Sequence, residues 1–243
     1  MKKIIFFILL FIAIPVYASN NLDTDGDCIL DYDEKNVYFT NYQKTDTDGD
    51  GYSDWIELNN GYSPHNVEGV KLEDSDTDND GLSDRMELNF HTSLIDSDTD
   101  DDGYLDGDEI KYGYDPLDPE RSELEKRIEI NTGDQELSYF LGGVRMEKFL
   151  ISSGKNNTTP KGHYSIINKR LKAWSPYGLW MPYWMGLGTG KFGLHELPIW
   201  PNGYREGEDH LGIPVSHGCI RLGIGPAEFL YNWAEVRTPV FIY

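Results

Sequence analysis

Apolar and polar positions alternate along the second half of the chain. The alternation covers RIEINTGDQELSYFL (127–141) and continues in GGVRMEKFLISSG (142–154), after a Gly142-Gly143 pair. A period of two predicts half-buried strands, and glycines between such runs predict hairpin turns. Two more segments read as strands, TPKGHYSIINK (159–169) and TPVFIY (238–243).

One short helix is expected among these strands. It opens at Pro226, a residue favoured in the first turn of a helix, and places Phe229, Leu230 and Trp233 on one face. The pattern therefore predicts a compact, mainly β domain with a single helix, for which about 115 residues suffice.

The first half of the chain instead repeats a twelve-residue acidic frame. Acidic residues occupy positions one, three, five, nine and twelve of four segments, at 23–34, 46–57, 76–87 and 98–109. Position six is Gly51, Gly81 or Gly103 in three of them, which suits a sharp turn, but Cys28 in the first. A solvated acidic segment, the plain alternative, would not keep glycine and glutamate on a fixed frame.

This spacing is typical of a loop that wraps oxygen ligands around calcium, with a backbone carbonyl at position seven and a bidentate Glu at twelve. Position nine is expected to bind directly or through water. Without the ion the carboxylates repel one another, so we expect a region that orders when calcium binds. The candidate ligands are Asp23, Asp25, Asp27, Asp31, Glu34, Asp46, Asp48, Asp50, Asp54, Glu57, Asp76, Asp78, Asp80, Asp84, Glu87, Asp98, Asp100, Asp102, Asp106 and Glu109.

The N-terminal segment MKKIIFFILLFIAIPVYASN predicts export. Two lysines precede an apolar run, and Val16-Tyr17-Ala18 fits cleavage after Ala18. The run is shorter than the roughly 20 residues of a membrane span, so no stable span is expected. An uncleaved signal anchor is the alternative.

Charge divides the mature chain into two regions. Residues 19–120 hold 30 acidic and 5 basic residues, whereas 121–243 hold 12 acidic and 14 basic ones. Such an acidic half argues against a nucleic-acid partner. The chain has only two cysteines, which excludes a disulfide framework, and a Cys28–Cys219 bridge is disfavoured because it would silence Cys219 as a nucleophile.

Cys219 lies in VSHGCIRL (215–222) and is a candidate nucleophile. A thiol attacks an acyl carbon as thiolate, so it needs a base or a cation nearby and amide donors for the oxyanion. His217 lies two residues before it, Gly218 lets the backbone approach a substrate, and His195 follows a strand-like stretch. From these residues alone, a buried structural cysteine beside a surface histidine is an equally open interpretation.

Aromatic residues crowd the segment that precedes His195. They are Trp174, Tyr177, Trp180, Tyr183 and Trp184. Such a cluster forms either core or a hydrophobic lid, or else the wall of a cleft that stacks on glycan or peptide.

The run HELPIWPNGYREGEDHLGIPVSHGCIRL (195–222) closely resembles the L,D-transpeptidase (YkuD-like) catalytic domain, as does TPKGHYSI (159–166). The resemblance spans residues 128–243. It implies a β-sandwich in which Cys219 is the nucleophile and His195 the proton acceptor and later donor. It also implies that Ser216, His217 and Gly218 shape the site and that backbone amides near Gly218 and Cys219 bind the oxyanion. Arg221 would hold the loop or bind a substrate carboxylate.

Two features depart from the family pattern. Twenty residues separate His195 from Ser216, which fits an insertion at PNGYREGED (201–209), and Glu196 stands where glycine or serine is common. His210, which follows the insertion, is the competing base.

The acidic half resembles bacterial thrombospondin type 3 repeats. GYDPLDPE (113–120) matches the G-x-D-P-L-x-P connector of these repeats, and GYSPHNVE (61–68) is a weaker match. The resemblance implies a calcium-stiffened spacer or an interaction module. Dockerins, which have similar loops, are the runner-up.

The N-terminal segment and the two resemblances together predict four segments: a signal peptide (1–18), an extended repeat region (19–120), a linker (121–127) and a catalytic domain (128–243). The implied protein is exported to the periplasm or cell wall, acts on peptidoglycan stem peptides and needs no cofactor for catalysis. Cys219 would displace the terminal D-alanine of a stem, and an amine would resolve the thioester into a crosslink. If water were the acceptor, the protein would be an L,D-carboxypeptidase. A further alternative is a calcium-dependent adhesion protein without turnover that binds the cell wall or surface proteins.

Overall fold

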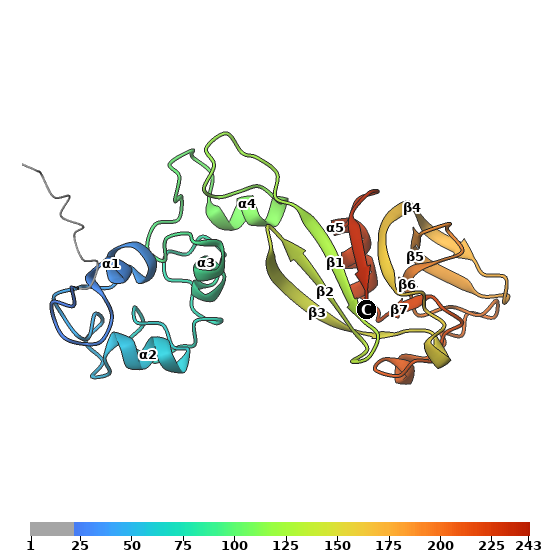
Figure 1. Ribbon diagram of the computed structural model, residues 1–243, viewed down its shortest axis with the longest axis horizontal. Coiled ribbons are helices and arrows are strands. Elements are labelled where there is room, and N and C mark those ends of the chain that lie inside the picture. Colours follow the sequence, from blue (N-terminus) through green and yellow to red (C-terminus); the bar gives the residue numbers. More distant parts are fainter. Residues whose placement is uncertain (1–21) are drawn as a thin grey trace, which may run out of the picture. The chain divides into compact units, whose positions relative to one another are not determined.

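The computed structural model describes residues 22–243, so the predicted signal peptide lies outside the described residues. The chain divides into two compact units between Ser97 and Asp98 (Figure 1). The fourth acidic loop therefore belongs to the same unit as the β domain.

The described part of the first unit carries three acidic loops, and each loop leads into a short helix. The helical elements are α1 (Asp31–Asp33), the π-helical turn η1 (Glu34–Tyr38), α2 (Asp54–Asn60) and α3 (Asp84–Phe90). Each α-helix begins at the ninth loop position, where an acidic side chain interacts favourably with the helix dipole. Leu72 and Leu94 are fully buried between these helices and loops.

The second unit opens with the fourth loop and α4 (Asp106–Tyr112). Its connector then folds back: Tyr114 forms a β-bridge with Glu123, and Leu124 N–H donates to the Gly113 carbonyl. The remaining strands and helices are β1 (Lys126–Asn131), β2 (Glu136–Leu141), β3 (Val144–Ser152), η2 (Lys155–Asn157), β4 (Gly162–Trp174), β5 (Trp180–Leu187), β6 (Phe192–Glu196), η3 (Glu208–His210), β7 (Ile220–Leu222), α5 (Pro226–Trp233) and β8 (Pro239–Ile242).

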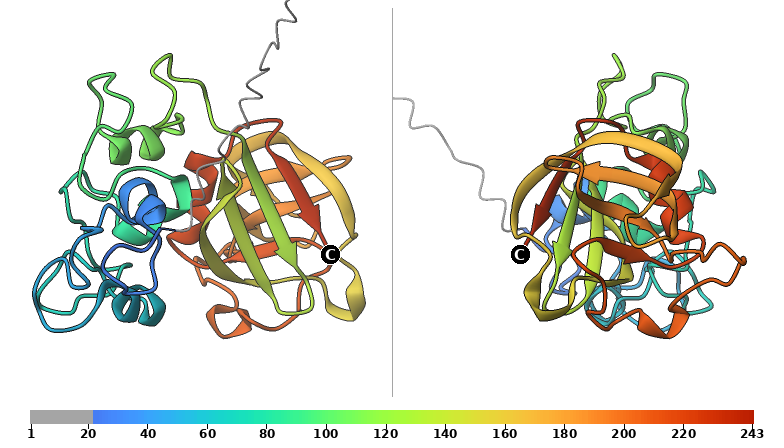
Figure 2. Two further views of the ribbon diagram at one scale, coloured as in Figure 1. Left: turned by 60° about the vertical axis from the view of Figure 1, so that its left-hand side comes forward. Right: turned by 90° about the vertical axis from the view of Figure 1, so that its right-hand side faces the viewer.

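The eight strands close into one barrel in the order β1-β2-β3-β7-β6-β5-β4-β8 (Figure 2). The β1/β8 and β6/β7 pairs are parallel and the other pairs are antiparallel. The predicted mainly β domain with one short helix is confirmed. Where a sandwich of two sheets was expected, strand pairing continues around the whole barrel.

Alternating apolar side chains fill the barrel. Ile128 and Ile130 of β1 are fully buried, while Arg127 and Glu129, which alternate with them along the strand, are not, as the period of two predicts. Pro226 lies in the first turn of α5, and Leu230 of this helix is fully buried in the same core. The helix packs against β5 and β6, and so supports the strand that carries His195.

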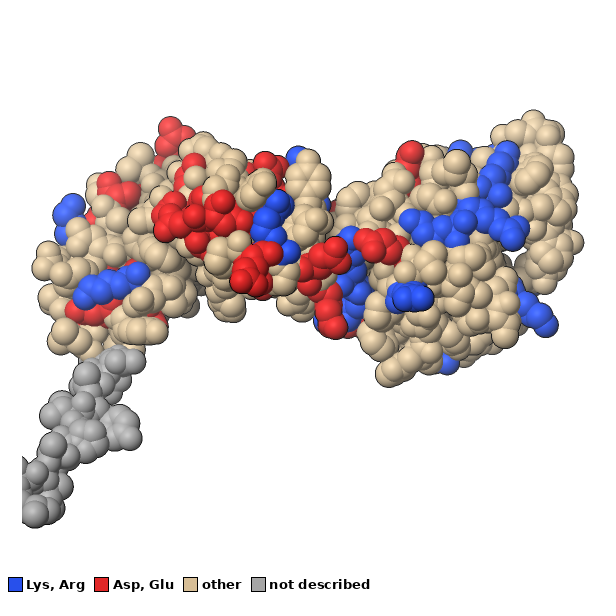
Figure 3. Space-filling view, turned by 90° about the horizontal axis from the view of Figure 1, so that it is seen from above, with Lys and Arg blue, Asp and Glu red and all other residues tan. Residues whose placement is uncertain are grey.

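Charge is distributed over the surface as the sequence predicts. Among the charged residues, Asp and Glu predominate on the visible surface of the repeats, whereas Lys and Arg predominate on the visible face of the barrel (Figure 3). In the part of the chain that the structure describes, no helix has the length and apolar character needed to cross a membrane.

Candidate functional site

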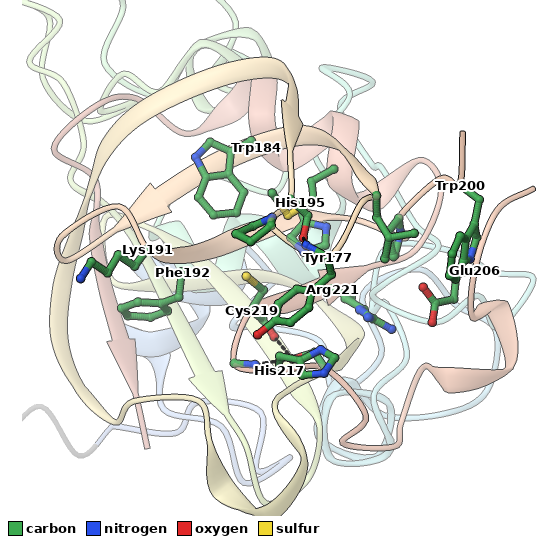
Figure 4. A pocket seen from close by; sticks show the side chains of 17 residues that line it. Tyr177, Trp184, Lys191, Phe192, His195, Trp200, Glu206, His217, Cys219 and Arg221 are labelled. Carbon is green, nitrogen blue, oxygen red and sulfur yellow. Dashed lines mark hydrogen bonds between the residues drawn. The ribbon is translucent and has the colours of Figure 1, made fainter. Parts of the chain in front are cut away.

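A pocket of about 310 Å³ opens on the barrel beside β6 and β7 (Figure 4). Its lining includes all six catalytic candidates of the sequence analysis: His195, Ser216, His217, Gly218, Cys219 and Arg221. Apolar side chains, among them Leu179, Met181 and Phe192, form much of its wall. The predicted residues therefore meet around one cavity.

Strand register explains how His195 reaches Cys219 across 24 positions of sequence. β6 and β7 run parallel, with His195 paired to Arg221. Residues two apart on a strand point to the same face, so Cys219, just before β7, shares the face of Arg221 and of His195. The parallel pair thus presents thiol, imidazole and guanidinium to one pocket.

His195 is buried and held in one orientation. Its Nδ1 lies 2.6 Å from the Glu196 carbonyl oxygen. A carbonyl only accepts, so this contact assigns the proton to Nδ1 and leaves Nε2 as the basic nitrogen. Burial lowers the pKa of His195 to about 4, although the Glu196 hydrogen bond opposes the shift and Arg221 adds to it. The imidazole is therefore neutral near pH 7.

Cys219 is a neutral thiol in its resting state. Burial raises the pKa of Cys219, while a hydrogen bond from the Gly193 backbone N–H and the charge of Arg221 act in the opposite direction. Gly193 was missed by the sequence analysis. A Cβ at this position would collide with the Met185 carbonyl oxygen, so only glycine lets β6 lie this close to β5. Its place two residues before His195 in KFGLHE was the available signal.

The Ser-His-Gly-Cys turn is shaped by hydrogen bonds of Ser216. The Ser216 hydroxyl donates to the Cys219 carbonyl at 2.6 Å and accepts from the Gly218 N–H at 3.0 Å. Thr159 Oγ1 donates to the Gly218 carbonyl at 3.1 Å. Gly218 has φ +138°, a conformation that favours glycine. The Gly218 amide is therefore engaged within the turn.

His217 lies at the mouth of the pocket. Its exposed ring stacks on Tyr177, with centroids 4.1 Å apart and planes 16° apart. Both rings line the cavity. His217 therefore forms part of the rim together with an aromatic partner.

The aromatic cluster divides between the two interpretations of the sequence. Tyr177 and Trp184 line the pocket, and Trp184 stacks over His195 at 6.0 Å between ring centroids. Trp174 and Trp180 pack against each other at 4.7 Å, outside the pocket lining. The cleft-wall reading thus fits Tyr177 and Trp184, and the packing reading fits Trp174 and Trp180.

The predicted insertion contributes a charged pair and a pocket residue. Arg205 Nη1 forms an ion pair with Glu196 Oε1, and Glu196 is buried. The next residue, Glu206, lines the pocket. Burial lowers the pKa of Arg221, and the charge of Glu206 opposes this shift. The sequence analysis predicted no contact for the side chains of Arg205 and Glu206. His210, the competing base, lies in η3 and is not among the residues that line the pocket.

Each acidic loop gathers three aspartates. The carboxylates at positions one, three and five offer oxygens within 4.8 Å of one another, as in Asp46, Asp48 and Asp50. The same holds for 23–27, 76–80 and 98–102. These triads have the hard oxygen donors that calcium prefers.

The aspartate at position nine is held by the threonine at position two. In the second loop, Asp54 Oδ1 accepts from the Thr47 N–H at 2.8 Å, and Oδ2 accepts from Thr47 Oγ1 at 2.7 Å. The arrangement recurs for Asp31 with Thr24, Asp84 with Thr77 and Asp106 with Thr99. Position nine therefore braces the loop.

The glutamate at position twelve is buried against the triad. Glu57 is 4% exposed, and neither carboxylate oxygen has a hydrogen-bond partner among the described residues. Burial, together with the charges of Asp48 and Asp50, raises the pKa of Glu57 to about 8. A divalent cation would offset this cost, so the donor set fits calcium.

The first loop departs from the others at position six. Cys28 adopts φ +85°, where the other loops have glycine with φ of 93° to 101°. A residue with a Cβ is strained in this region. Cys28 and Cys219 are both free thiols, in agreement with the expectation that no bridge joins them.

Comparison with known proteins finds a matching family model in each half of the chain. Residues 125–242 match the model described as the L,D-transpeptidase catalytic domain (YkuD), and residues 46–61, 76–92 and 98–119 match the bacterial TSP3 repeat.

Two Bacillus subtilis (strain 168) proteins are similar to the chain. “Putative L,D-transpeptidase YciB” is 28% identical over 133 residues, covering 51% of this chain and 69% of the relative. “Putative L,D-transpeptidase YkuD” is 29% identical over 105 residues, covering 43% and 57%. Among solved structures, an L,D-transpeptidase from Mycobacterium smegmatis is 20% identical with a TM-score of 0.43, covering 50% of this chain and 59% of that one.

Proposed function

Because the chain belongs to the L,D-transpeptidase family and carries bacterial TSP3 repeats before its catalytic domain, we propose that it is an exported peptidoglycan L,D-transpeptidase. The observation that supports this most directly is the convergence of Cys219, His195 and Arg221 on one pocket through the parallel β6/β7 pair. The proposed donor is a stem tetrapeptide, and the proposed acceptor is an amine of a neighbouring stem.

The first half-reaction forms a thioester. His195 Nε2 takes the thiol proton while Cys219 Sγ bonds to the carbonyl carbon of the L-to-D peptide bond. When the tetrahedral intermediate collapses, the C–N bond breaks and His195 returns the proton to the departing D-alanine nitrogen. Burial raises the pKa of Cys219 and lowers that of His195, so the proton lies on the thiol at rest and His195 Nε2 is free to accept it.

The second half-reaction runs in the opposite sense. His195 accepts a proton from the attacking amine, the amine nitrogen bonds to the thioester carbon, and the C–S bond breaks. The proton then returns to the thiolate, which restores Cys219. Water in place of the amine would give the carboxypeptidase outcome.

In this proposal a backbone N–H group of the Gly218–Cys219 turn stabilises the oxyanion. The Gly218 amide already donates to Ser216 Oγ, so the Cys219 amide is the donor in this proposal. Arg221, buried two residues further along, supplies positive charge for a substrate carboxylate.

We assign the four acidic loops to calcium, bound by the carboxylates at positions one, three and five, the carbonyl at seven and the Glu at twelve. The aspartate at position nine, proposed to contact the ion directly or through water, also braces the loop through its threonine partner. Bound calcium would neutralise the clustered carboxylates of segment 19–120, making it an ordered spacer between the envelope and catalytic segment 128–243. The proposed location is the periplasm or the cell wall.

The test is incubation of the purified protein with stem tetrapeptides, followed by mass spectrometry. We expect loss of D-alanine and formation of crosslinked dimers. Cys219→Ala should abolish both while leaving the fold intact, because removing one sulfur leaves only a small cavity. Loss of D-alanine without dimers would assign hydrolysis, and unchanged turnover in Cys219→Ala would exclude Cys219 as the nucleophile.

A further inference from the structure

The segment between Pro198 and His210 reaches back into the pocket instead of passing over the surface. Ile199 forms β-bridges with Trp180 and with Arg205, and Trp200 N–H donates to the Tyr204 carbonyl at 2.8 Å. These contacts fold residues 199–205 into a hairpin on β5. The ion pair between Arg205 and buried Glu196 then fastens the hairpin to the strand of His195.

This anchoring places the carboxylate of Glu206 in the pocket. Its Oε2 atom is shielded from solvent and accepts no hydrogen bond from the described residues. Arg221 is near enough for Glu206 to act on its pKa, yet no ion pair within 4.0 Å joins them in the described part of the chain. A shielded carboxylate oxygen without a hydrogen-bond partner can accept from a donor on a bound substrate.

The charges of the pocket are arranged with Cys219 in the middle. Figure 4 shows Lys191 on one side of Cys219 and Glu206 on the other, with Arg221 between Cys219 and Glu206. Trp200 lines the pocket from the same hairpin that carries Glu206. An aromatic face and a carboxylate both attract ammonium groups, so this side of the pocket favours a cationic amine.

We propose that Glu206 is a specificity-determining residue that binds the side-chain ammonium of the diamino acid in the acyl donor. The inference rests on the proposed function, since it concerns the donor of the same reaction. The amine, one side chain away from the scissile carbonyl, would lie toward Glu206 and Trp200. The carboxylate-bearing leaving group would then lie toward Lys191, on the opposite side of Cys219.

The experiment measures the rate of acyl-enzyme formation by intact-protein mass spectrometry. Three tetrapeptide donors are compared: one with a free side-chain amine, one with that amine acetylated and one with it succinylated. A charge-assisted hydrogen bond predicts that the wild-type chain is acylated about 10- to 100-fold faster by the free amine than by the acetylated donor. The succinylated donor should be slower still. These arms need no variant.

Two variants locate the effect. Glu206→Gln should reduce the preference for the free amine to less than about 3-fold, because the amide carries no charge. Asp209→Asn removes an exposed carboxylate from the same segment, outside the pocket lining, and should keep the wild-type preference.

The outcomes separate this inference from the proposed function. No acylation by any donor would overturn the proposed function and the inference with it. Acylation at equal rates by free and acetylated donors would overturn the inference alone. An equal loss for both donors in Glu206→Gln would also overturn it, because Glu206 would then act by positioning Arg221.

Discussion

The ion pair between Arg205 and Glu196 should be a large local contribution to the stability of the barrel. Arg205→Met removes the cation but keeps much of the side-chain length. The Glu196 side chain is 5% exposed and that of Arg205 is 30% exposed, so the substitution leaves a nearly buried carboxylate without its counter-ion.

The expected cost follows from this burial. Breaking a buried pair by removing one partner costs about 3–5 kcal/mol, and the partial exposure of Arg205 puts this case at the low end. We expect a loss of about 3 kcal/mol in the free energy of unfolding, or about 6–12 °C in Tm for a unit of this size. In Arg205→Met/Glu196→Gln no unpaired charge is left, so most of the loss should be recovered.

Thermal unfolding followed by tryptophan fluorescence is a suitable assay, because five of the six tryptophans lie in residues 98–243. Lys148→Met is the matched control. It breaks an ion pair with Glu136 whose side chains are 56% and 33% exposed, and it should cost at most about 1 kcal/mol. If Arg205→Met costs no more than Lys148→Met, or if the double variant loses as much as the single one, the buried-charge reasoning is wrong.

Four further predictions concern the base and the loops. His195→Ala should lower turnover by roughly 10²- to 10⁴-fold and His210→Ala by far less; the reverse order would move the base into the inserted segment. Because burial lowers the pKa of His195 from 6.5 to about 4, the base stays unprotonated until pH falls to that value. The acid limb of kcat/KM should lie near pH 4, and a limb at pH 6–7 would contradict a buried neutral imidazole. Chelating calcium should make the repeats more sensitive to proteolysis. Cys28→Gly removes the backbone strain at φ +85° and should tighten calcium binding to the first loop. Titration calorimetry measures this affinity, and an unchanged affinity would show that the strain is unimportant.

Much of the barrel was predictable because its rules are local. The alternation in 127–154 requires one buried face, and the Gly142-Gly143 pair allows the left-handed turn found there, with φ of 56° and 91°. The helix from Pro226 follows from the same kind of reasoning. Barrel closure was not predictable, because it depends on β1 pairing in parallel with β8, whose partners are about 110 residues apart.

The acidic frame shows what spacing alone leaves out. Its twelve-residue spacing predicted the triads and set position nine apart as a residue that binds directly or through water, but it did not predict the contact of this residue with the threonine at position two. The N–H and hydroxyl of Thr47 each donate to one oxygen of the Asp54 carboxylate. Thr occurs at position two in all four loops, so the signal was present in the sequence. Its meaning depends on the loop bringing residues seven apart into contact.

The two departures from the family pattern are one structural feature. In the sequence, Glu196 and the inserted segment are separate irregularities, and each weakens the alignment around His195. In the fold, the segment returns Arg205 to Glu196, and the backbone carbonyl of Glu196 holds Nδ1 of His195. The residue that orients the proposed base is thus the one that anchors the hairpin carrying Glu206 into the pocket. Loss of the ion pair should therefore affect the orientation of His195 and the position of Glu206 together, and with them both the turnover and the proposed substrate preference.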